Sequence, residues 1–252
     1  MPGGKKSDMT KPETELSVVI PIYNEEDNIE PLLEELFPIL RNTGKTFEVL
    51  CVDDASSDKS LFVLNGQKKK FPELRIIRHK INSGESAAGA TGFAHAEGSV
   101  IITIDGDQQN DPADIPALLK ALENADAVCG VRRKREDDWV KRISSRVANR
   151  FRNRVTGDAI SDAGCTFRAL KAGTLREIPV FNGMHRFLPT LLRLQGYKVV
   201  EILVNHRPRT RGKSKYGIGN RMFRGLIDCF AIRWWRRRCV KADRVHNEDR
   251  KK

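Results

Sequence analysis

The sequence lacks the apolar segments and cysteine pairs that mark membrane-spanning, secreted or zinc-binding proteins. No stretch of the 252 residues approaches about 18 consecutive apolar residues, so none predicts a membrane-spanning helix. Residues 1–15 have no apolar signal-peptide core, and we expect them to form a disordered leader. The five cysteines include no Cys-x-x-Cys pair, which favours reduced, buried thiols in a cytosolic protein.

A dinucleotide-binding glycine fingerprint and internal repeats are also absent. No Gly-x-Gly-x-x-Gly follows the first apolar run, which argues against an ordinary dinucleotide site. The chain is long enough for one full-sized α/β domain or two small ones, and we expect a single domain. We expect this domain at residues 16–219, followed by a basic tail at 220–252.

The positive charge is concentrated in two segments. The net charge is +12, and residues 132–154 and 216–252 each contribute +7, so the rest of the chain is close to neutral. Such segments bind phosphate, anionic lipid or nucleic acid, although a basic run can also be a plain solvated face.

Short apolar runs alternate with helical spacing, which predicts a mostly parallel sheet flanked by helices. The expected strands are 16–24, 47–58, 74–80, 99–107, 125–132, 162–170 and 197–208. The expected helices are 29–40, 84–98, 112–122, 140–155 and 184–194. Asn24 or Asp27 is a suitable cap for the first helix, and the small residues of the second would let it lie close to a sheet.

Several expected strands end in acidic residues, and in open α/β sheets such ends line the ligand crevice. Asp105 and Asp107 close one strand, and Gly106 between them would let the backbone bend close to a ligand. Two carboxylates this close repel each other unless a cation lies between them, and Gln109 offers a third oxygen. The pattern predicts a Mg²⁺ or Mn²⁺ site, and the alternative is an acidic cap before Pro112.

Two other strand ends could hold a nucleotide. Asp53 and Asp54 could accept hydrogen bonds from a base or ribose, unless they only form a turn. At the end of the first strand, the residues that could cradle the base and sugar from the other side are Pro21, Tyr23, Asn24 and Glu25.

Basic residues lie where they could bind phosphate. Arg132 ends a strand, and a glycine-containing loop carries four cations suited to closing over a diphosphate, or forms a solvated turn. The four are Arg209, Arg211, Lys213 and Lys215. His79, His95 and His246 have no evident partner, whereas His185 and His206, beside arginines, fit a structural role.

The basic tail has the pattern of an amphipathic helix. Met222, Leu226, Phe230 and Trp234 form one apolar row, and arginines fill the other face. Such a helix lies in a membrane headgroup layer, or packs on its own domain or on a second copy.

Together these motifs resemble the inverting family-two glycosyltransferases of GT-A fold, most closely the dolichyl-phosphate mannosyltransferase and polyprenyl-phosphate glycosyltransferase branch. The segments that carry the resemblance are "SVVIPIYNEEDNI", "VLCVDDASSD", "NSGESAAGATGFAHAEG", "ITIDGDQQNDP", "DAGCTFRAL", "GMHRFLP" and "RGKSKYG". Ala55 departs from the pattern, because relatives carry glycine there. Many bacterial relatives also continue into transmembrane helices, so here we expect the tail to provide membrane attachment.

The resemblance implies roles for particular residues. Nucleotide binding falls to Pro21, Tyr23, Glu25, Val52, Asp53 and Asp54. Metal and diphosphate binding falls to Asp105, Gly106, Asp107 and Gln109. The resemblance implies that the donor phosphates are bound by Arg132, Arg209 and Lys215, and that the acceptor phosphate is bound by Lys141, Arg142 and Ser145. Asp162 lies in a turn on the acceptor side.

The implied reaction moves a sugar from a UDP- or GDP-sugar to a polyprenyl or dolichyl phosphate on the cytoplasmic face of a membrane, for cell-envelope glycan or glycolipid synthesis. A lipid phosphate is already anionic and needs no base, whereas a saccharide or lipid hydroxyl acceptor would need one, for which Asp162 is the candidate. A haloacid-dehalogenase-like phosphatase carries its Asp-x-Asp motif on the first strand, whereas this chain carries the motif on its fourth expected strand. A nucleic-acid binder would leave the acidic strand ends without a purpose, so we expect no nucleic-acid partner.

Overall fold

The computed structural model describes residues 14–133, 149–176, 178–209 and 218–238. In this part of the chain seven strands form one sheet in the order β3-β2-β1-β4-β6-β5-β7. They are β1 (Leu16–Ile22), β2 (Phe47–Asp53), β3 (Leu74–Arg78), β4 (Val100–Thr103), β5 (Ala127–Arg132), β6 (Arg168–Lys171) and β7 (Val199–Val204). Strand β6 is antiparallel to β4 and β5, and the other neighbouring strands pair in parallel, which confirms the predicted α/β fold.

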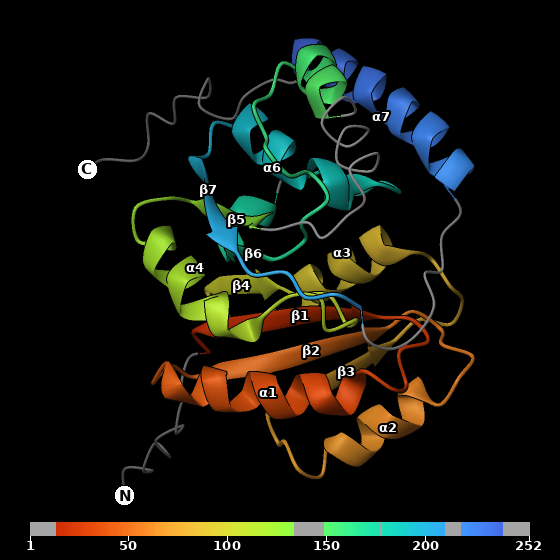
Figure 1. Ribbon diagram of the computed structural model, residues 1–252, viewed down its shortest axis with the longest axis vertical. Coiled ribbons are helices and arrows are strands. Elements are labelled where there is room, and N and C mark those ends of the chain that lie inside the picture. The colour runs from red at the N-terminus through yellow and green to blue at the C-terminus, as the bar shows by residue number, and fades with distance from the viewer. Residues whose placement is uncertain (1–13, 134–148, 177, 210–217, 239–252) are drawn as a thin grey trace, which may run out of the picture.

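Helices cover both faces of the sheet (Figure 1). They are α1 (Ile29–Asn42), α2 (Ser60–Gln67), α3 (Glu85–His95), α4 (Ile115–Leu122), α6 (Met184–Leu194) and α7 (Ile218–Arg238), with short 3₁₀ turns η1 (Pro112–Asp114) and η2 (Ala172–Leu175). Residues 149–156 are also helical. The buried sides of α1 and α4 share one core cluster with the sheet, and α6 and α7 share the other. Ala169 and Leu170 belong to different clusters, because successive strand residues point to opposite faces.

Three details of the sequence prediction are wrong. The first is the cap of α1, which is Asn28, because Asn24 adopts a left-handed φ of 51° and its Oδ1 accepts the Ser57 N–H at 2.8 Å. The second is α2, which was not predicted because its buried side includes Ser60 and Gln67 and so shows no apolar stripe. The third is the segment 162–170, in which only the residues from Arg168 onward form a strand.

The small-residue helix α3 lies close against the sheet, as predicted. A Cβ atom on Gly92 would be 2.2 Å from Val19 Cγ1, which is shorter than any van der Waals contact. The absence of a side chain at Gly92 therefore allows α3 to pack on β1. The predicted helix 140–155 is described only from residue 149, and its first half lies outside the described residues.

The order of the strands places a crevice at one edge of the sheet. Strand β1 pairs with β2 on one side and with β4 on the other, so the chain reverses direction across the sheet between β1 and β4. Ligands of open α/β sheets bind at such a switch point, outside the carboxyl ends of the strands. The segments following β1, β2, β4 and β5 all start from this edge.

Candidate active site

The acidic pair lies directly beyond β4 at the switch point. Asp105 accepts a hydrogen bond from the Thr166 hydroxyl, and its backbone N–H donates to Asn110 Oδ1 at 3.1 Å. Burial, and after it the negative charge of Asp107, raise the pKa of Asp105 to about 6, while the Thr166 hydrogen bond and nearby arginines act to lower it. A cation bound directly beside Asp105 would stabilise the charged form of its carboxylate.

Gly106 fills a place where a side chain does not fit. A Cβ atom there would lie 2.7 Å from Ile22 Cδ1 and 3.3 Å from the Pro21 carbonyl oxygen. The glycine therefore lets the acidic loop pack on the end of β1. The sequence suggested a different reason, an approach of the backbone to a ligand.

The acidic loop is tied to the segment that follows β7. The Gln109 carbonyl accepts the Arg207 N–H at 2.8 Å, and Gln109 Nε2 donates to the Arg207 carbonyl at 3.4 Å. The Arg207 guanidinium forms two hydrogen bonds to Glu35, at 2.7 and 2.6 Å, and an ion pair with Asp111 at 2.8 Å. These contacts hold the segment after β7 across the carboxyl edge of the sheet.

Arg209 at the end of this segment lies on the acidic pair. Its Nη2 is 2.6 Å from Asp107 Oδ2 and 4.0 Å from Glu25 Oε1. Asp107, predicted to bind the metal, and Arg209, predicted to bind the donor phosphates, thus pair with each other. The other basic residues of this loop, Arg211, Lys213 and Lys215, lie outside the described residues.

Arg132 and Asp162 form a second cross-site pair. Arg132 Nε is 2.7 Å from Asp162 Oδ2, and Nη2 is 2.8 Å from Oδ1. A two-point pair of this kind fixes the plane of the guanidinium. Asp162 therefore orients Arg132 at the end of β5, and its carboxylate is engaged in that task. The predicted acceptor residues Lys141, Arg142 and Ser145 fall outside the described part of the chain.

On the side of the site predicted to hold the nucleotide, Asp54 is held by the segment that leads into α3. Its carboxylate accepts the N–H groups of Ser83 and Gly84 at 2.8 and 2.7 Å, and lies 2.7 Å from His79 Nδ1. The prediction that His79 has no partner is wrong, because its other nitrogen also lies 2.9 Å from Thr91 Oγ1. Asp54 therefore joins the loop after β2 to the start of α3.

Asp53 and Val52 are more deeply buried than their predicted role suggests. The Asp53 side chain is fully buried, accepts the Ser56 N–H at 3.1 Å and lies 3.3 Å from Arg78 Nε. The Val52 side chain is also fully buried. Pro21 reaches the crevice, where it lines a pocket together with Asp105.

This pocket, between α3 and α6, contains residues that the sequence reasoning missed. Its polar lining includes Glu85, Ser86, Thr166, Arg168 and His185. Ser86 Oγ accepts the Gly183 N–H at 3.0 Å and lies 2.8 Å from His185 Nδ1. The polar residues of "GESAAG" and "CTFRAL" were the available signal, but nothing in the sequence places these segments side by side.

Arg168 is a buried cation at the base of this pocket. Only 2% of the residue is exposed, and its two terminal nitrogens donate to the carbonyls of His185 and Cys165, each at 2.8 Å. Its Nε has no hydrogen-bond partner among the described residues. The pocket thus combines hydrogen-bonding groups with a positive charge close to Asp105.

The donor set at the acidic loop fits a hard divalent cation. The described residues include no group of three or more His, Cys, Asp or Glu side chains that could hold a metal. Asp105, Asp107 and the amide oxygen of Gln109 are nevertheless the oxygen ligands that Mg²⁺ and Mn²⁺ take, and Mg²⁺ completes its shell with water and substrate phosphate.

Four buried cysteines are free thiols, and burial raises the pKa of Cys51 to about 12.

Comparison with known proteins identifies the family. Residues 17–179 match the family model described as Glycosyl transferase family 2. The chain belongs to this family. The resemblance seen in the sequence is therefore confirmed, in preference to the phosphatase alternative.

Two curated relatives of this family-2 chain are polyprenyl-phosphate sugar transferases. It is 36% identical over 206 residues to the undecaprenyl-phosphate 4-deoxy-4-formamido-L-arabinose transferase of Edwardsiella ictaluri, covering 81% of the chain and 63% of that protein. It is 36% identical over 231 residues to the dodecaprenyl-phosphate galacturonate synthase of Rhizobium johnstonii, covering 88% and 68%. The chain thus spans about two thirds of the length of these relatives.

Solved structures share the fold. Glucosyl-3-phosphoglycerate synthase of Mycobacterium tuberculosis, in complex with Mn²⁺, UDP and phosphoglyceric acid, matches with a TM-score of 0.67 at 18% identity, covering 91% of this chain and 80% of that one. A mannosyltransferase of Pyrobaculum calidifontis in complex with GDP-Man and Mn²⁺ matches with a TM-score of 0.63 at 22% identity, covering 90% and 65%. The family-2 chain therefore has the GT-A fold of glycosyltransferases.

Proposed function

We propose that this protein is a metal-dependent, inverting glycosyltransferase that moves a sugar from a UDP- or GDP-sugar to a polyprenyl phosphate. The observation that carries the proposal is the acidic pair Asp105 and Asp107 at the β1/β4 switch point, within reach of the Arg209 cation. The names of the two curated relatives support the lipid-phosphate acceptor.

The donor diphosphate lies against the acidic loop. Asp105, Asp107 and Gln109 would hold a Mg²⁺ or Mn²⁺ ion, which supplies positive charge to the diphosphate as it leaves. Arg132 and Lys215 add cationic contacts, and Arg209 exchanges Asp107 for a phosphate oxygen.

The nucleoside part lies over the ends of β1 and β2, where Tyr23, Glu25 and the Asp53–Asp54 turn meet. Asn24 and Ser57 join the two loops, with Asn24 Oδ1 accepting the Ser57 N–H at 2.8 Å. This contact pre-forms the cradle before a ligand arrives.

The transferred sugar occupies the pocket between α3 and α6. Asp105 stands in its lining, so the anomeric carbon lies near the diphosphate while the hydroxyls meet Glu85, Ser86 and His185. Arg168 adds a positive charge at the base.

The state of Asp162 favours a phosphate acceptor. Its carboxylate is bound at two points by Arg132, so the side chain is positioned to orient a cation and not to remove a proton. A lipid phosphate is an anionic nucleophile that needs no base, and Lys141, Arg142 and Ser145 would bind it. A saccharide or lipid hydroxyl acceptor is the alternative.

The acceptor chemistry sets the location. A polyprenyl phosphate is a membrane lipid and nucleotide sugars are cytosolic, so we place the protein on the cytoplasmic face of a membrane, in cell-envelope glycan or glycolipid synthesis. Among the described helices, none has the length and apolar character needed to cross a bilayer. We propose that the basic tail contacts the membrane surface.

The function is tested with a panel of radiolabelled UDP- and GDP-sugars, a polyprenyl phosphate, and Mg²⁺ or Mn²⁺. The expected result is metal-dependent movement of one label into the organic phase. Label found only in a water-soluble product would reject the lipid acceptor and favour a saccharide hydroxyl.

A further inference from the structure

The two basic segments of the sequence meet in one surface pocket. Arg154, from the first segment, lines it together with three arginines of α7 from the second. These are Arg233, Arg236 and Arg237. Charges that the sequence could only count in separate regions thus form a single four-arginine pocket, away from the acidic loop.

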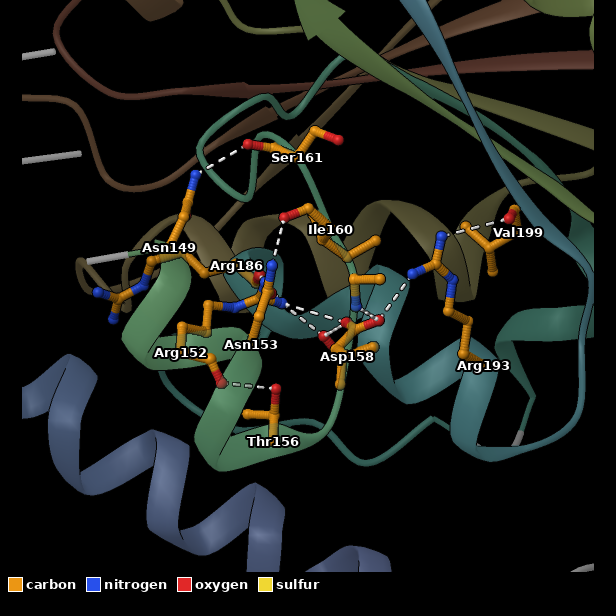
Figure 2. A network of polar contacts seen from close by, with 12 residues as sticks. Asn149, Arg152, Asn153, Thr156, Asp158, Ile160, Ser161, Arg186, Arg193 and Val199 are labelled. Atoms are coloured by element: carbon orange, nitrogen blue, oxygen red, sulfur yellow. Dashed lines mark hydrogen bonds and ion pairs between the residues drawn. The ribbon is translucent and has the colours of Figure 1, made fainter. Parts of the chain in front are cut away.

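The first wall of the four-arginine pocket is held in place by a buried polar network (Figure 2). Asp158 lies beneath it, with Arg193 Nη1 at 2.7 Å and Arg152 Nη2 at 3.6 Å. Asn153 Nδ2 donates to the Ile160 carbonyl at 2.9 Å. The helical segment that carries Arg154 is therefore fixed on α6.

The second wall, α7, packs on the same platform. Cys229 and Ile232 are buried in the cluster formed with α6, and Asp228 makes an ion pair with Arg186 at 3.4 Å. Arg236 Nη1 donates to the Thr156 carbonyl at 3.1 Å, which links the two walls directly. The alternative in which the tail packs on its own domain is thus correct for this side of the helix.

Within the described residues, ion pairs do not neutralise the charge of the four-arginine pocket. In the ranges that the structure describes, no carboxylate forms an ion pair with any of its four arginines. Like charges gathered in one pocket repel each other, and an anion removes that repulsion. Guanidinium groups bind phosphate oxygens in a planar, two-point geometry, so the fitting ligand is a phosphate group.

The side of α7 that faces away from its buried residues carries an exposed apolar stripe. Ile227, Phe230 and Trp234 are 67%, 58% and 61% exposed, at i, i+3 and i+7 on the side away from buried Cys229 and Ile232. Large apolar side chains beside clustered arginines are typical of helices that lie in a membrane interface. A soluble phosphate or a nucleic acid would make no use of this stripe.

We propose that the four-arginine pocket binds the phosphate of an anionic lipid headgroup while Ile227, Phe230 and Trp234 enter the interfacial layer. This deepens the proposed function, on which it rests only for the expectation that the protein meets a membrane. The pocket is distinct from the acidic loop, so lipid binding and sugar transfer can be measured separately.

The test compares the wild-type protein with Arg233→Glu/Arg237→Glu, which leaves the Arg236 contact to Thr156 intact. Co-sedimentation is measured with phosphatidylcholine vesicles with and without phosphatidylglycerol. The wild type binds only the anionic vesicles. The variant loses about tenfold or more of that affinity, because each basic residue near an anionic surface contributes about fivefold in affinity. Lys68→Glu/Lys69→Glu, on the exposed end of α2, carries the same charge change and binds normally.

Phe230→Ser/Trp234→Ser separates a lipid from a free phosphate. It weakens binding to anionic vesicles while both arginines remain, which a soluble phosphate site would not predict. All variants keep the wild-type melting temperature and wild-type transfer to a short, detergent-soluble polyprenyl phosphate. If the wild type transfers no sugar at all, the proposed function fails while the vesicle result still decides this inference.

Three outcomes would overturn the inference. The first is unchanged binding of Arg233→Glu/Arg237→Glu to anionic vesicles. The second is saturable binding of inorganic phosphate that this variant abolishes, with vesicle binding intact. The third is a preference of the wild type for a single-stranded oligonucleotide over anionic vesicles.

Discussion

Arg209 Nη2 lies 2.6 Å from Asp107 Oδ2, so the cation expected to grip the donor diphosphate rests on a carboxylate expected to hold the metal. The two partners come from segments about a hundred residues apart, and the Arg207 contacts to Glu35 bring them together. In the proposed function, metal and arginine compete for Asp107 until a diphosphate arrives and takes the arginine. The proposal therefore predicts that metal binding and nucleotide binding are coupled.

Substitution of Arg209 by Gln should raise the affinity for Mn²⁺ alone and lower the affinity for the nucleotide. Loss of the competing cation tightens binding of Mn²⁺ alone by about fivefold, as expected for a partly exposed charged pair. Loss of a phosphate ligand weakens UDP or GDP binding in the presence of Mn²⁺ by about tenfold. Calorimetric titration measures both.

Arg176→Gln, at the opposite edge of the sheet, is the matched control and should change neither affinity. Unchanged Mn²⁺ affinity in Arg209→Gln would show that the pair with Asp107 does not restrain the site.

The raised pKa of Asp105 predicts that its charge destabilises the metal-free protein. The folded-state pKa of about 6 exceeds the ordinary value of 3.8, so the contribution of Asp105 to stability is lost as the pH rises through 6. Asp105→Asn should therefore stabilise the protein in EDTA by up to about 3 kcal/mol at about pH 8, and by little at about pH 4. Thermal melts at both pH values measure this.

Metal provides the complementary observation. Mn²⁺ should raise the melting temperature of the wild type above pH 6 and lose this effect below it, because protons then compete for Asp105. Equal stabilisation of Asp105→Asn by Mn²⁺ would contradict a role for Asp105 as a ligand.

The strand-and-helix alternation and the acidic loop could be predicted from the sequence because both depend on local patterns. Apolar runs identified β1 to β5, and the spacing of Asp105, Asp107 and Gln109 marked the acidic loop at which we propose a cation. The pairing of Arg132 with Asp162, and of Asp54 with the N–H groups of Ser83 and Gly84, could not be predicted. These contacts join residues about thirty positions apart, and only the packed sheet brings them together.

The same limit explains the pockets. Ser86 and His185 are separated by 99 positions, and their contact arises because α3 and α6 pack on one face of the sheet. The tail showed an amphipathic pattern, but not which side faces the protein. The buried Cys229 and Ile232 decide that, and leave Phe230 and Trp234 on the outside.

Asp162→Asn tests whether Asp162 positions Arg132 or acts as a base. As a positioning residue, its loss should raise the KM for the donor several-fold and leave the shape of the kcat pH profile unchanged. A general base would instead lose about 10²- to 10⁴-fold in kcat with a changed profile. Asp126→Asn, at the opposite end of β5, is the control carboxylate.

Gly106→Ala should destabilise the fold because its Cβ would lie 2.7 Å from Ile22 Cδ1. Overpacking of this kind costs about 1–3 kcal/mol. Ile22→Val removes the Cδ1 atom at a cost of about 1 kcal/mol on its own. The double variant should lose less stability than the sum of the two, measured by chemical denaturation, whereas additive losses would show that the two atoms do not meet.

The most direct test of the account is the rate at which labelled sugar moves from its nucleotide donor to polyprenyl phosphate in wild type and in Asp107→Ala, with Mn²⁺ or EDTA. The wild type should transfer label into the organic phase only with metal. In Asp107→Ala the transfer rate should fall by about 10²-fold or more, because the variant loses charge stabilisation at the leaving diphosphate. The variant should still bind anionic vesicles. Full activity of Asp107→Ala would contradict the metal site at the centre of the proposal.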